Sequence, residues 1–383
     1  MTRDLRFLSL SLLLWGIGEG LFIYFQPLYL EELGADPLQI GGILGLGAVF
    51  LVLFHLPAGA LADLIGRKTI MVSAWFSGLI GTLTMFFANS LPIFVLGLVI
   101  YSFSGFVLSP LSSYITAAKG KWSVARALTT VTAFFSFGTV LSPIIGGQIA
   151  ERFGLRTIYG VAAFLFFISM IFVLFVRSQP VERAKEGPRY GNLVRNYTLI
   201  GFLLLVFVAS IGMYLSWPLT PIYLREERLV SISTIGIFGS INALGIVVLN
   251  LTLGRMIPRS GFLLAQSLVG ASTLFIWKGI GAGWYAFGYF LAAGYRTSRY
   301  MVSAQVETLV AKTEMGLAYG LTETINGTVI LIASPIAGSL YSLEPDLPFM
   351  VSLALTVIAV VLVWRFWPHV RRNQLKIETK GNY

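Results

Sequence analysis

Hydrophobic residues in this chain are gathered into long stretches, which recur about every 30 residues between short polar segments. Most stretches approach or exceed the ~20 residues that a helix needs to cross the hydrocarbon core of a bilayer. They predict twelve membrane-spanning helices, at 7–30, 38–62, 69–88, 91–116, 127–150, 155–176, 197–224, 232–257, 262–280, 283–310, 315–341 and 347–367. The first stretch is long, carries Glu19 and lacks a small-residue cleavage signal, so we expect it to remain in the mature chain.

The sequence also contains an internal repeat, because several segments of the first half recur about 194 residues further along. The paired segments are Gln26–Leu30 with Thr220–Leu224, Ile40–Ile43 with Ile235–Phe238, and Ser142–Gly146 with Ser334–Gly338. A duplicated bundle of membrane helices is the plan of many secondary transporters, whose substrate binds between the two copies.

Composition agrees with this plan, because charged residues make up 11% of the chain and hydrophobic residues 56%, whereas a soluble domain has roughly a quarter charged residues. We therefore predict an all-α integral membrane fold with a six-helix bundle at 1–176 and another at 197–383, which ends in a basic cytoplasmic tail. Residues 177–196 form the longest polar stretch, with two Pro and two Gly, and are predicted to be the cytoplasmic linker.

The net charge of +10 would suit nucleic acid or an anionic membrane surface. Its distribution instead follows the positive-inside rule: if the sides alternate from a cytoplasmic N-terminus, most of the 27 Lys and Arg residues are cytoplasmic. The basic residues of the outer loops are then Arg152, Arg156, Arg225, Arg228 and Lys278. We expect both termini to be cytoplasmic, the protein to lie in the plasma (inner) membrane, and nucleic acid not to be a partner.

Several chemistries have no residues to support them. The chain has no Cys, only two His (His55 and His369) and no phosphate-binding loop of the Walker type. We therefore expect no enzyme activity, cofactor or metal site, and His55 is interpreted as a buried histidine. Any energy for pumping would come from an ion gradient or a partner.

The segment Gly59-x-x-x-Asp63-x-x-Gly66-Arg67-Lys68 lies between the second and third spans. It resembles the signature loop of the major facilitator superfamily, and the glycine-rich segment 138–147 of the fifth span is similar to another motif of that family. The resemblance implies twelve helices in two halves that open alternately to either side. It also implies a gate, with the residues Gly59, Asp63, Gly66, Arg67, Lys68, Pro143, Gly146 and Gly147.

In that family the acid of the loop faces the N-terminus of span eleven, here near 315–317, where the helix dipole favours a negative charge. Arg67 and Lys68 would then hold the loop to acidic groups or lipid phosphates, although a plain topology anchor is the alternative. The chain departs from the family pattern at Leu64, where an Arg is frequent, and at Tyr101, where proton-coupled drug exporters usually have Arg. No acid lies between Asp63 and Glu151, so the partner of Arg67 stays open.

Glu19 lies near the middle of the first span, where a charge is costly unless it faces a cavity or a partner. Helical spacing places it on one face with Trp15, Phe22 and Gln26. Its counterpart in the second copy is Met213, so the fold does not require an acid there. We interpret Glu19 as a group that binds substrate or a proton, with a buried structural pair as the alternative.

Arg296 lies near the middle of the tenth span with Arg299 one turn further on, and the equivalent first-copy positions are uncharged. Arginine stays charged and offers a planar fork to carboxylates and phosphates. Arg296 therefore either binds an anionic substrate or neutralises Glu19 or Glu323. Further substrate or coupling candidates, chosen for polar or aromatic side chains at mid-depth, are Gln26, Tyr214, Trp217, Asn242, Glu323 and Asn326.

Together these features predict a secondary active transporter that moves a small organic solute by alternating access. We expect coupling to protons, or to another ion, and a monomer surrounded by lipid. The alternatives are a multidrug or metabolite exporter of the same fold and a non-transporting membrane sensor or scaffold.

Overall fold

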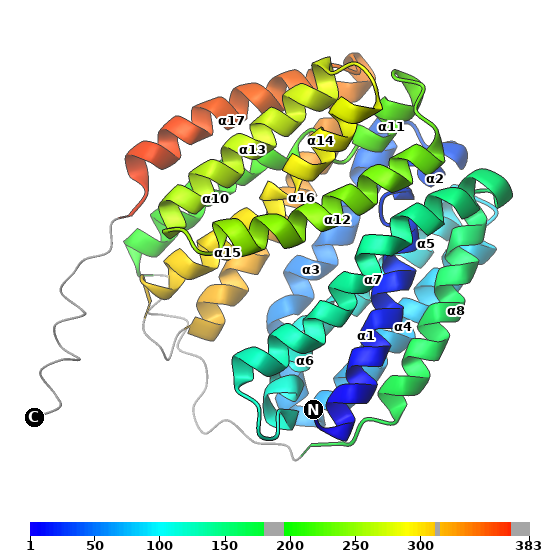
Figure 1. The fold of residues 1–383 in the computed structure, drawn as a ribbon, viewed down its shortest axis with the longest axis vertical. Coiled ribbons are helices and arrows are strands. Elements are labelled where there is room, and N and C mark those ends of the chain that lie inside the picture. The colour runs from blue at the N-terminus through cyan, green and yellow to red at the C-terminus, as the bar shows by residue number, and fades with distance from the viewer. Residues whose placement is uncertain (180–194, 311–314, 369–383) are drawn as a thin grey trace, which may run out of the picture.

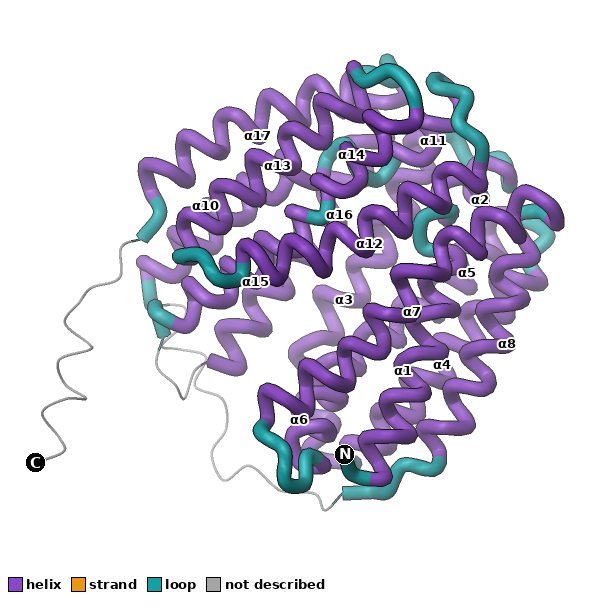
Figure 2. The backbone as a smooth tube through the Cα atoms, viewed as in Figure 1, coloured by secondary structure: helices purple, strands orange, loops and turns teal. Residues whose placement is uncertain are grey.

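The computed structural model describes residues 1–179, 195–310 and 315–368, and these residues form helices joined by turns (Figures 1 and 2). Of some helical residues only the backbone is described, namely residues 50, 51, 54–64, 108, 109, 124, 125 and 315–317. Within the described ranges, ten helices are long and apolar enough to cross a membrane. The remaining two predicted spans correspond to α3 and to the pair α14 and α15, so the prediction of twelve spans in an all-α membrane fold is confirmed.

Helices of the first half are α1 (Arg3–Phe22), α2 (Gln26–Glu32), α3 (Pro37–Ile65), α4 (Arg67–Phe87), α5 (Leu91–Ser102), the 3-10 helix η1 (Phe103–Val107), α6 (Leu108–Ala118), α7 (Val124–Phe153) and α8 (Leu155–Leu174). Those of the second half are α10 (Tyr197–Tyr214), α11 (Thr220–Glu226), α12 (Ile232–Leu253), α13 (Pro258–Lys278), α14 (Ala282–Ala292), α15 (Gly294–Glu307), α16 (Met315–Leu343) and α17 (Leu347–Phe366). Most of the predicted linker lies outside the described residues, and the domain boundaries stay a prediction.

Spans one and seven are broken at equivalent places. In each, a long helix ends and a short one begins with a proline in its first turn, Pro27 in α2 and Pro221 in α11. A proline has no N–H to donate to the preceding turn, and its ring clashes with that turn's carbonyl, so the helix stops. Our expectation that Gln26 continues the face of Glu19 was therefore wrong, because α1 ends at Phe22.

The two halves cross twice at the same end of the molecule, each time through a pair of glycines. A Cβ added at Gly41 of α3 would lie 3.1 Å from the Cα of Gly338 of α16, and one added at Gly236 of α12 would lie 3.1 Å from the Cα of Gly147 of α7. Small residues let helix backbones approach this closely in membranes. The glycines lie near the start of α3 and α12 and near the end of α7 and α16. Figure 1 shows α2 and α11 at the end of the molecule away from the N-terminus.

Polar contacts also join the halves at this end. The Glu151 carboxylate, at the end of α7, accepts a hydrogen bond from the backbone N–H of Ser233 at the start of α12, with an N···O distance of 2.8 Å. Glu31 on α2 lies near the charges of α11, where burial and the Glu226 carboxylate raise its pKa while Arg225 lowers it. This end therefore combines a hydrogen bond between the halves with a like-charge repulsion between Glu31 and Glu226, which Arg225 opposes.

Large apolar side chains cover much of the outer surface. Exposed examples from both halves include Phe76, Phe137, Phe167, Ile358 and Trp364. Contiguous exposure of such side chains is unfavourable in water, and it is expected of helices that face lipid tails.

Candidate functional site

A cavity of about 400 Å³ lies between the two halves, next to the breaks in spans one and seven. This volume is within the range of sites for small organic molecules. Six of the nine predicted substrate or coupling residues line it, namely Gln26, Tyr214, Trp217, Asn242, Arg296 and Arg299. Glu19, Glu323 and Asn326 are not among the lining residues.

Aromatic side chains from both halves form a wall of this cavity. Trp217, in the break of span seven, lies edge-on to Tyr24 from the break of span one, with ring centroids 6.4 Å apart. Tyr214 packs against Tyr295 of α15 at 5.3 Å. Tyr24 and Trp217 lie in the two helix breaks and line the cavity. The prolines that break the backbone therefore also place aromatic side chains in this wall.

Asn242 links the halves beside that wall. Its side chain is buried, its amide N–H donates to the Tyr289 carbonyl oxygen at 2.7 Å, and its amide oxygen accepts from the Tyr24 hydroxyl at 3.1 Å. Buried amides are rarely left unpaired, and here Asn242 is satisfied on both sides. Its contact with Tyr24 must change if the halves move apart.

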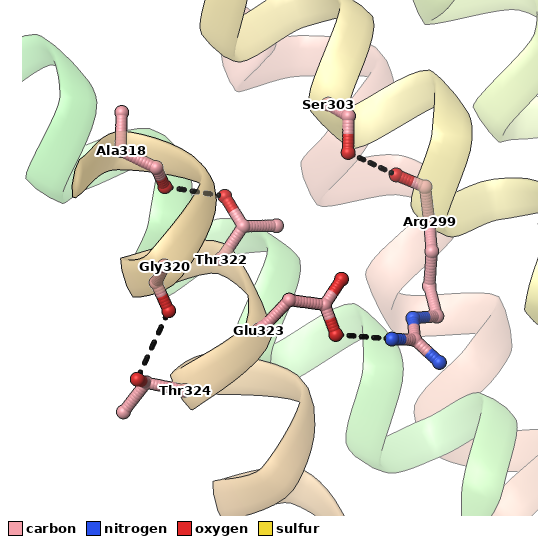
Figure 3. Close-up of polar contacts among 7 residues, drawn as sticks. All are labelled: Arg299, Ser303, Ala318, Gly320, Thr322, Glu323 and Thr324. Atoms are coloured by element: carbon pink, nitrogen blue, oxygen red, sulfur yellow. Dashed lines mark hydrogen bonds and ion pairs between the residues drawn. The ribbon is translucent and has the colours of Figure 1, made fainter. Parts of the chain in front are cut away.

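Charges of the second half follow a pattern different from the one expected. Glu323 of α16 pairs with Arg299 of α15 and not with Arg296 (Figure 3). The two paired side chains are each 33% exposed, so the pair is partly solvated and is worth about 0.5 kcal/mol. Arg296 is exposed to the cavity and has no carboxylate within 4.0 Å among the described residues.

Glu19 lies in an aromatic pocket of the first half. The Trp15 indole N–H donates to its carboxylate at 3.2 Å, and the side chain of Tyr101 lies near it. Trp15 stacks on Phe166 with ring centroids 4.2 Å apart, and Gly78 leaves room for the indole. Arg296 acts electrostatically on Glu19 from the other half without forming a direct ion pair.

Asn326 is buried on α16, and its amide nitrogen has no hydrogen-bond partner within the described part of the chain. It is therefore a buried donor one turn from Glu323. This arrangement is compatible with a side chain that changes partners during transport and with one that only packs. In the same part of the chain, no group of three acidic, His or Cys side chains is placed to hold a metal ion.

The predicted gate residues fall into two sets. Gly147 faces the other half, where an added Cβ would lie 3.0 Å from the Cα of Ser233, and Pro143 packs against Gly239. Gly146 instead packs on the Leu21 carbonyl of its own half. Pro143 and Gly147 thus lie at the closed end, and Gly146 lies within the first half.

At the opposite end, Arg67 and Lys68 make contacts that differ from those expected. Arg67 donates to the Gln179 side-chain oxygen at 3.1 Å, at the start of the predicted linker, and Lys68 donates to the Leu174 carbonyl at 3.0 Å. Both acceptors are neutral, and the expected contact with acidic groups or lipid phosphates stays a prediction. Gly66 has φ of 97°, which favours glycine, and it begins α4.

Gly59 and Asp63 lie in α3, but their side chains are outside the described part of the chain, and so is the proposed partner segment 315–317. The side chain of His55 is likewise outside the described part of the chain. The predicted contact between Asp63 and span eleven therefore stays a prediction.

Sequence reasoning missed Tyr24 and Tyr295 as cavity residues, and it treated Tyr101 only as a departure from a family pattern. Tyr24 lies in the break between α1 and α2. The signal in the sequence that could have identified it is Pro27, three residues later, which indicates that the helix stops. Tyr101 carries a signal in its position, since it is the first side chain with a polar group after the apolar run 91–100.

Three comparisons with known proteins bear on this arrangement. The multi-drug resistance efflux pump PmrA of Streptococcus pneumoniae serotype 4 is 32% identical over 242 residues, which are 58% of this chain and 58% of that protein. The multidrug resistance protein MdtG of Salmonella heidelberg is 22% identical over 98% of this chain and 97% of its own length. The crystal structure of the nucleoside transporter NupG superposes with a TM-score of 0.76 at 15% identity, covering 95% of this chain and 98% of that one, and has the same fold.

The family model described as Major Facilitator Superfamily matches residues 8–204 and again residues 202–381. These two matches follow the internal repeat seen in the helix breaks and glycine crossings, and together they cover nearly the whole chain. On this evidence the chain belongs to the Major Facilitator Superfamily.

Proposed function

We propose that this protein is a secondary active transporter that moves a small organic solute by alternating access, coupled to protons through Glu19. The observation that carries the proposal is the cavity between the halves, which exposes Arg296, together with the electrostatic interaction of Arg296 with Glu19 of the other half. Intramembrane charges are costly and are usually retained for substrate or ion pathways.

Coupling follows from the charge balance of this pair. When the cavity is empty, an ionised Glu19 partly compensates the charge of Arg296. A solute that binds Arg296 takes over that compensation. In a low-dielectric site the protonated form of Glu19 then has a lower free energy than the ionised form. Solute and proton would then cross together.

The orientation is proposed from the basic residues. With both termini in the cytoplasm, the glycine crossings of α3 with α16 and of α7 with α12 close the outer side of the plasma membrane. Reporter fusions at the C-terminus, one active only inside and one only outside, test this, and an outside C-terminus would overturn the orientation.

An exporter of drugs is the second candidate. PmrA and MdtG carry names that refer to multidrug resistance or efflux, and the aromatic wall around Trp217 and Tyr214 suits varied apolar molecules. The fold accommodates either direction, since the gradients decide which way a coupled carrier runs.

Transport is tested with purified wild-type protein in proteoliposomes that enclose a pH-sensitive dye. A solute library is first screened for compounds that raise the Tm, and each compound found is then added outside the vesicles. Acidification of the lumen that requires both the protein and the solute is expected. Solute movement without any proton movement would contradict proton coupling, and no movement of any stabilising solute would contradict transport.

A further inference from the structure

Arg296 and Arg299 are the two charged residues among the described residues that line the cavity, and they differ in their partners. Its side chain is exposed to the cavity, and no carboxylate lies within 4.0 Å of it among the residues that the structure describes. Arg299, one turn further along α15, is already neutralised by Glu323. The cavity therefore presents one positive charge that has no direct carboxylate partner among the described residues and that Glu19 compensates only in part.

Three of the uncharged polar groups that line the cavity already have hydrogen-bond partners. Thr220 donates to the Ser216 carbonyl at 2.8 Å, Thr273 donates to the Val269 carbonyl at 3.1 Å, and Asn242 is bonded on both sides. A solute would therefore find its charged donor without a carboxylate partner in the Arg296 guanidinium. Such a fork binds planar two-oxygen anions such as carboxylates.

The rest of the cavity surface fits a flat apolar body. Trp217, Tyr214, Tyr24 and Tyr295 contribute aromatic faces, and a volume of about 400 Å³ suits a molecule with one or two rings. Aromatic walls favour ring-bearing ligands through offset or edge-on packing.

From this charge and shape we infer that the cargo is an aromatic monoanion, with its carboxylate on Arg296 and its ring against Trp217 and Tyr214. A single negative charge matches the single positive charge without a direct partner, since the charge of Arg299 is already balanced. Cations are disfavoured because Arg296 repels them in a poorly screened site. The inference rests on the proposed function, because it names the class of solute.

The test is equilibrium binding to detergent-purified protein, measured by calorimetry, with three probes of one shape and different charge. The probes are 1-naphthoate, the neutral 1-naphthamide and the cationic 1-naphthylmethylamine, and acetate serves as an anion without a ring. We expect 1-naphthoate to bind at least about tenfold more tightly than each of the others, which is the effect of one charge-assisted pair.

Variants locate the site. Arg296→Gln is expected to remove the preference for 1-naphthoate over 1-naphthamide, and Arg296→Lys to retain part of it, because an ammonium cannot reproduce the fork. Trp217→Leu should weaken both ring-bearing probes alike. Arg365→Gln, at an exposed arginine of α17 far from the cavity lining, is the matched control and should bind like wild type.

Three outcomes would overturn the inference: no binding of 1-naphthoate to wild type, equal or tighter binding of the cationic probe, or an unchanged preference in Arg296→Gln. Binding is measured without a gradient, so a failure of proton coupling leaves these results unaffected. Conversely, proton-coupled transport of a neutral or cationic solute would leave the proposed function standing and reject the aromatic monoanion.

Discussion

The two halves of this protein share a backbone plan and differ in their charges. Spans one and seven break at equivalent prolines, Pro27 and Pro221, and the equivalent glycines Gly41 and Gly236 each meet a glycine of the other half. The charges are not repeated: Glu19 corresponds to Met213, and Arg296 corresponds to an uncharged residue near Ser104. Both members of that proposed coupling pair therefore lack a copy in the opposite half.

This difference separates structural framework from chemistry. Features present in both halves are those that any pair of rocking bundles needs, namely close approach and broken helices. Features present in one half belong to the solute and the ion, because a pseudo-symmetric cavity meets an asymmetric cargo. The predictions that follow either disturb a repeated feature or compare one residue with its counterpart.

The largest effect is expected at the glycine crossings. Gly41→Ala and Gly236→Ala would each place a Cβ against backbone of the other half, and overpacking of this kind costs about 1–3 kcal/mol. Both variants should lower the Tm by several degrees and impair transport to a similar extent. Gly42→Ala is the control, because an added Cβ there has no other atom within 4 Å.

Equal behaviour of Gly41→Ala and Gly42→Ala would contradict the crossing as the contact between the halves. A large effect of only one of the two crossing variants would show that the repeat is not functionally equivalent.

A smaller effect is expected from the tyrosines that follow the two prolines. Tyr223 bonds to the Asp346 carboxylate at 2.9 Å and accepts from Arg228 at 2.7 Å, whereas Tyr29 packs on Phe94 and has no described hydroxyl bond of this kind. Tyr223→Phe should cost about 1 kcal/mol. Tyr29→Phe, the matched control, should stay within about 0.5 kcal/mol of wild type, and both are measured by thermal unfolding.

Next comes the pair of Arg299 and Glu323, which the first half lacks. Each single variant, Arg299→Gln or Glu323→Gln, leaves a charge without its partner, while the double variant removes both. A double-mutant cycle on thermal stability should give a coupling of about 0.5 kcal/mol, since both side chains are one-third exposed. Additive single effects would mean that the pair contributes nothing.

The smallest effect is expected at Glu31, which occupies the place of Arg225 in the repeat. Burial and the Glu226 carboxylate raise its pKa, so the ionised form is disfavoured in the folded protein. Its unfavourable contribution is therefore present at neutral pH and disappears as the pH falls below the ordinary value. Glu31→Gln should raise the Tm at pH 7 and leave it unchanged near pH 4, and a lower Tm at pH 7 would contradict this sign.

The sequence predicted most of the fold because its signals are local. Span lengths, the repeat and the polar segments between spans require only apolar runs and positions of proline and glycine. The prediction missed the break at Pro27 and continued the helix through it. The reason is that the spacing of Trp15, Glu19 and Phe22 fits a continuous helix. That error hid Tyr24, which reaches the cavity only because the helix ends.

The sequence predicted most residues of the candidate site but did not predict which of them contact one another. Glu323 reaches Arg299 and not Arg296 because one helical turn decides which arginine faces α16. Arg67 bonds to Gln179, 112 residues further along the chain, and an uncharged amide gives no charge signal in the sequence. Pairings of this kind depend on how helices rotate against one another, which periodicity does not specify.

The most direct test of the account compares accumulation with exchange in proteoliposomes, using a solute that binds the wild-type protein. Glu19→Gln should exchange labelled solute across the bilayer at about the wild-type rate but fail to concentrate it when a pH gradient is imposed. Glu32→Gln, an exposed acid at the end of α2, is the control and should still concentrate the solute. Concentration of solute by Glu19→Gln at the wild-type rate would contradict the claim that the unrepeated acid of the first half couples transport to protons.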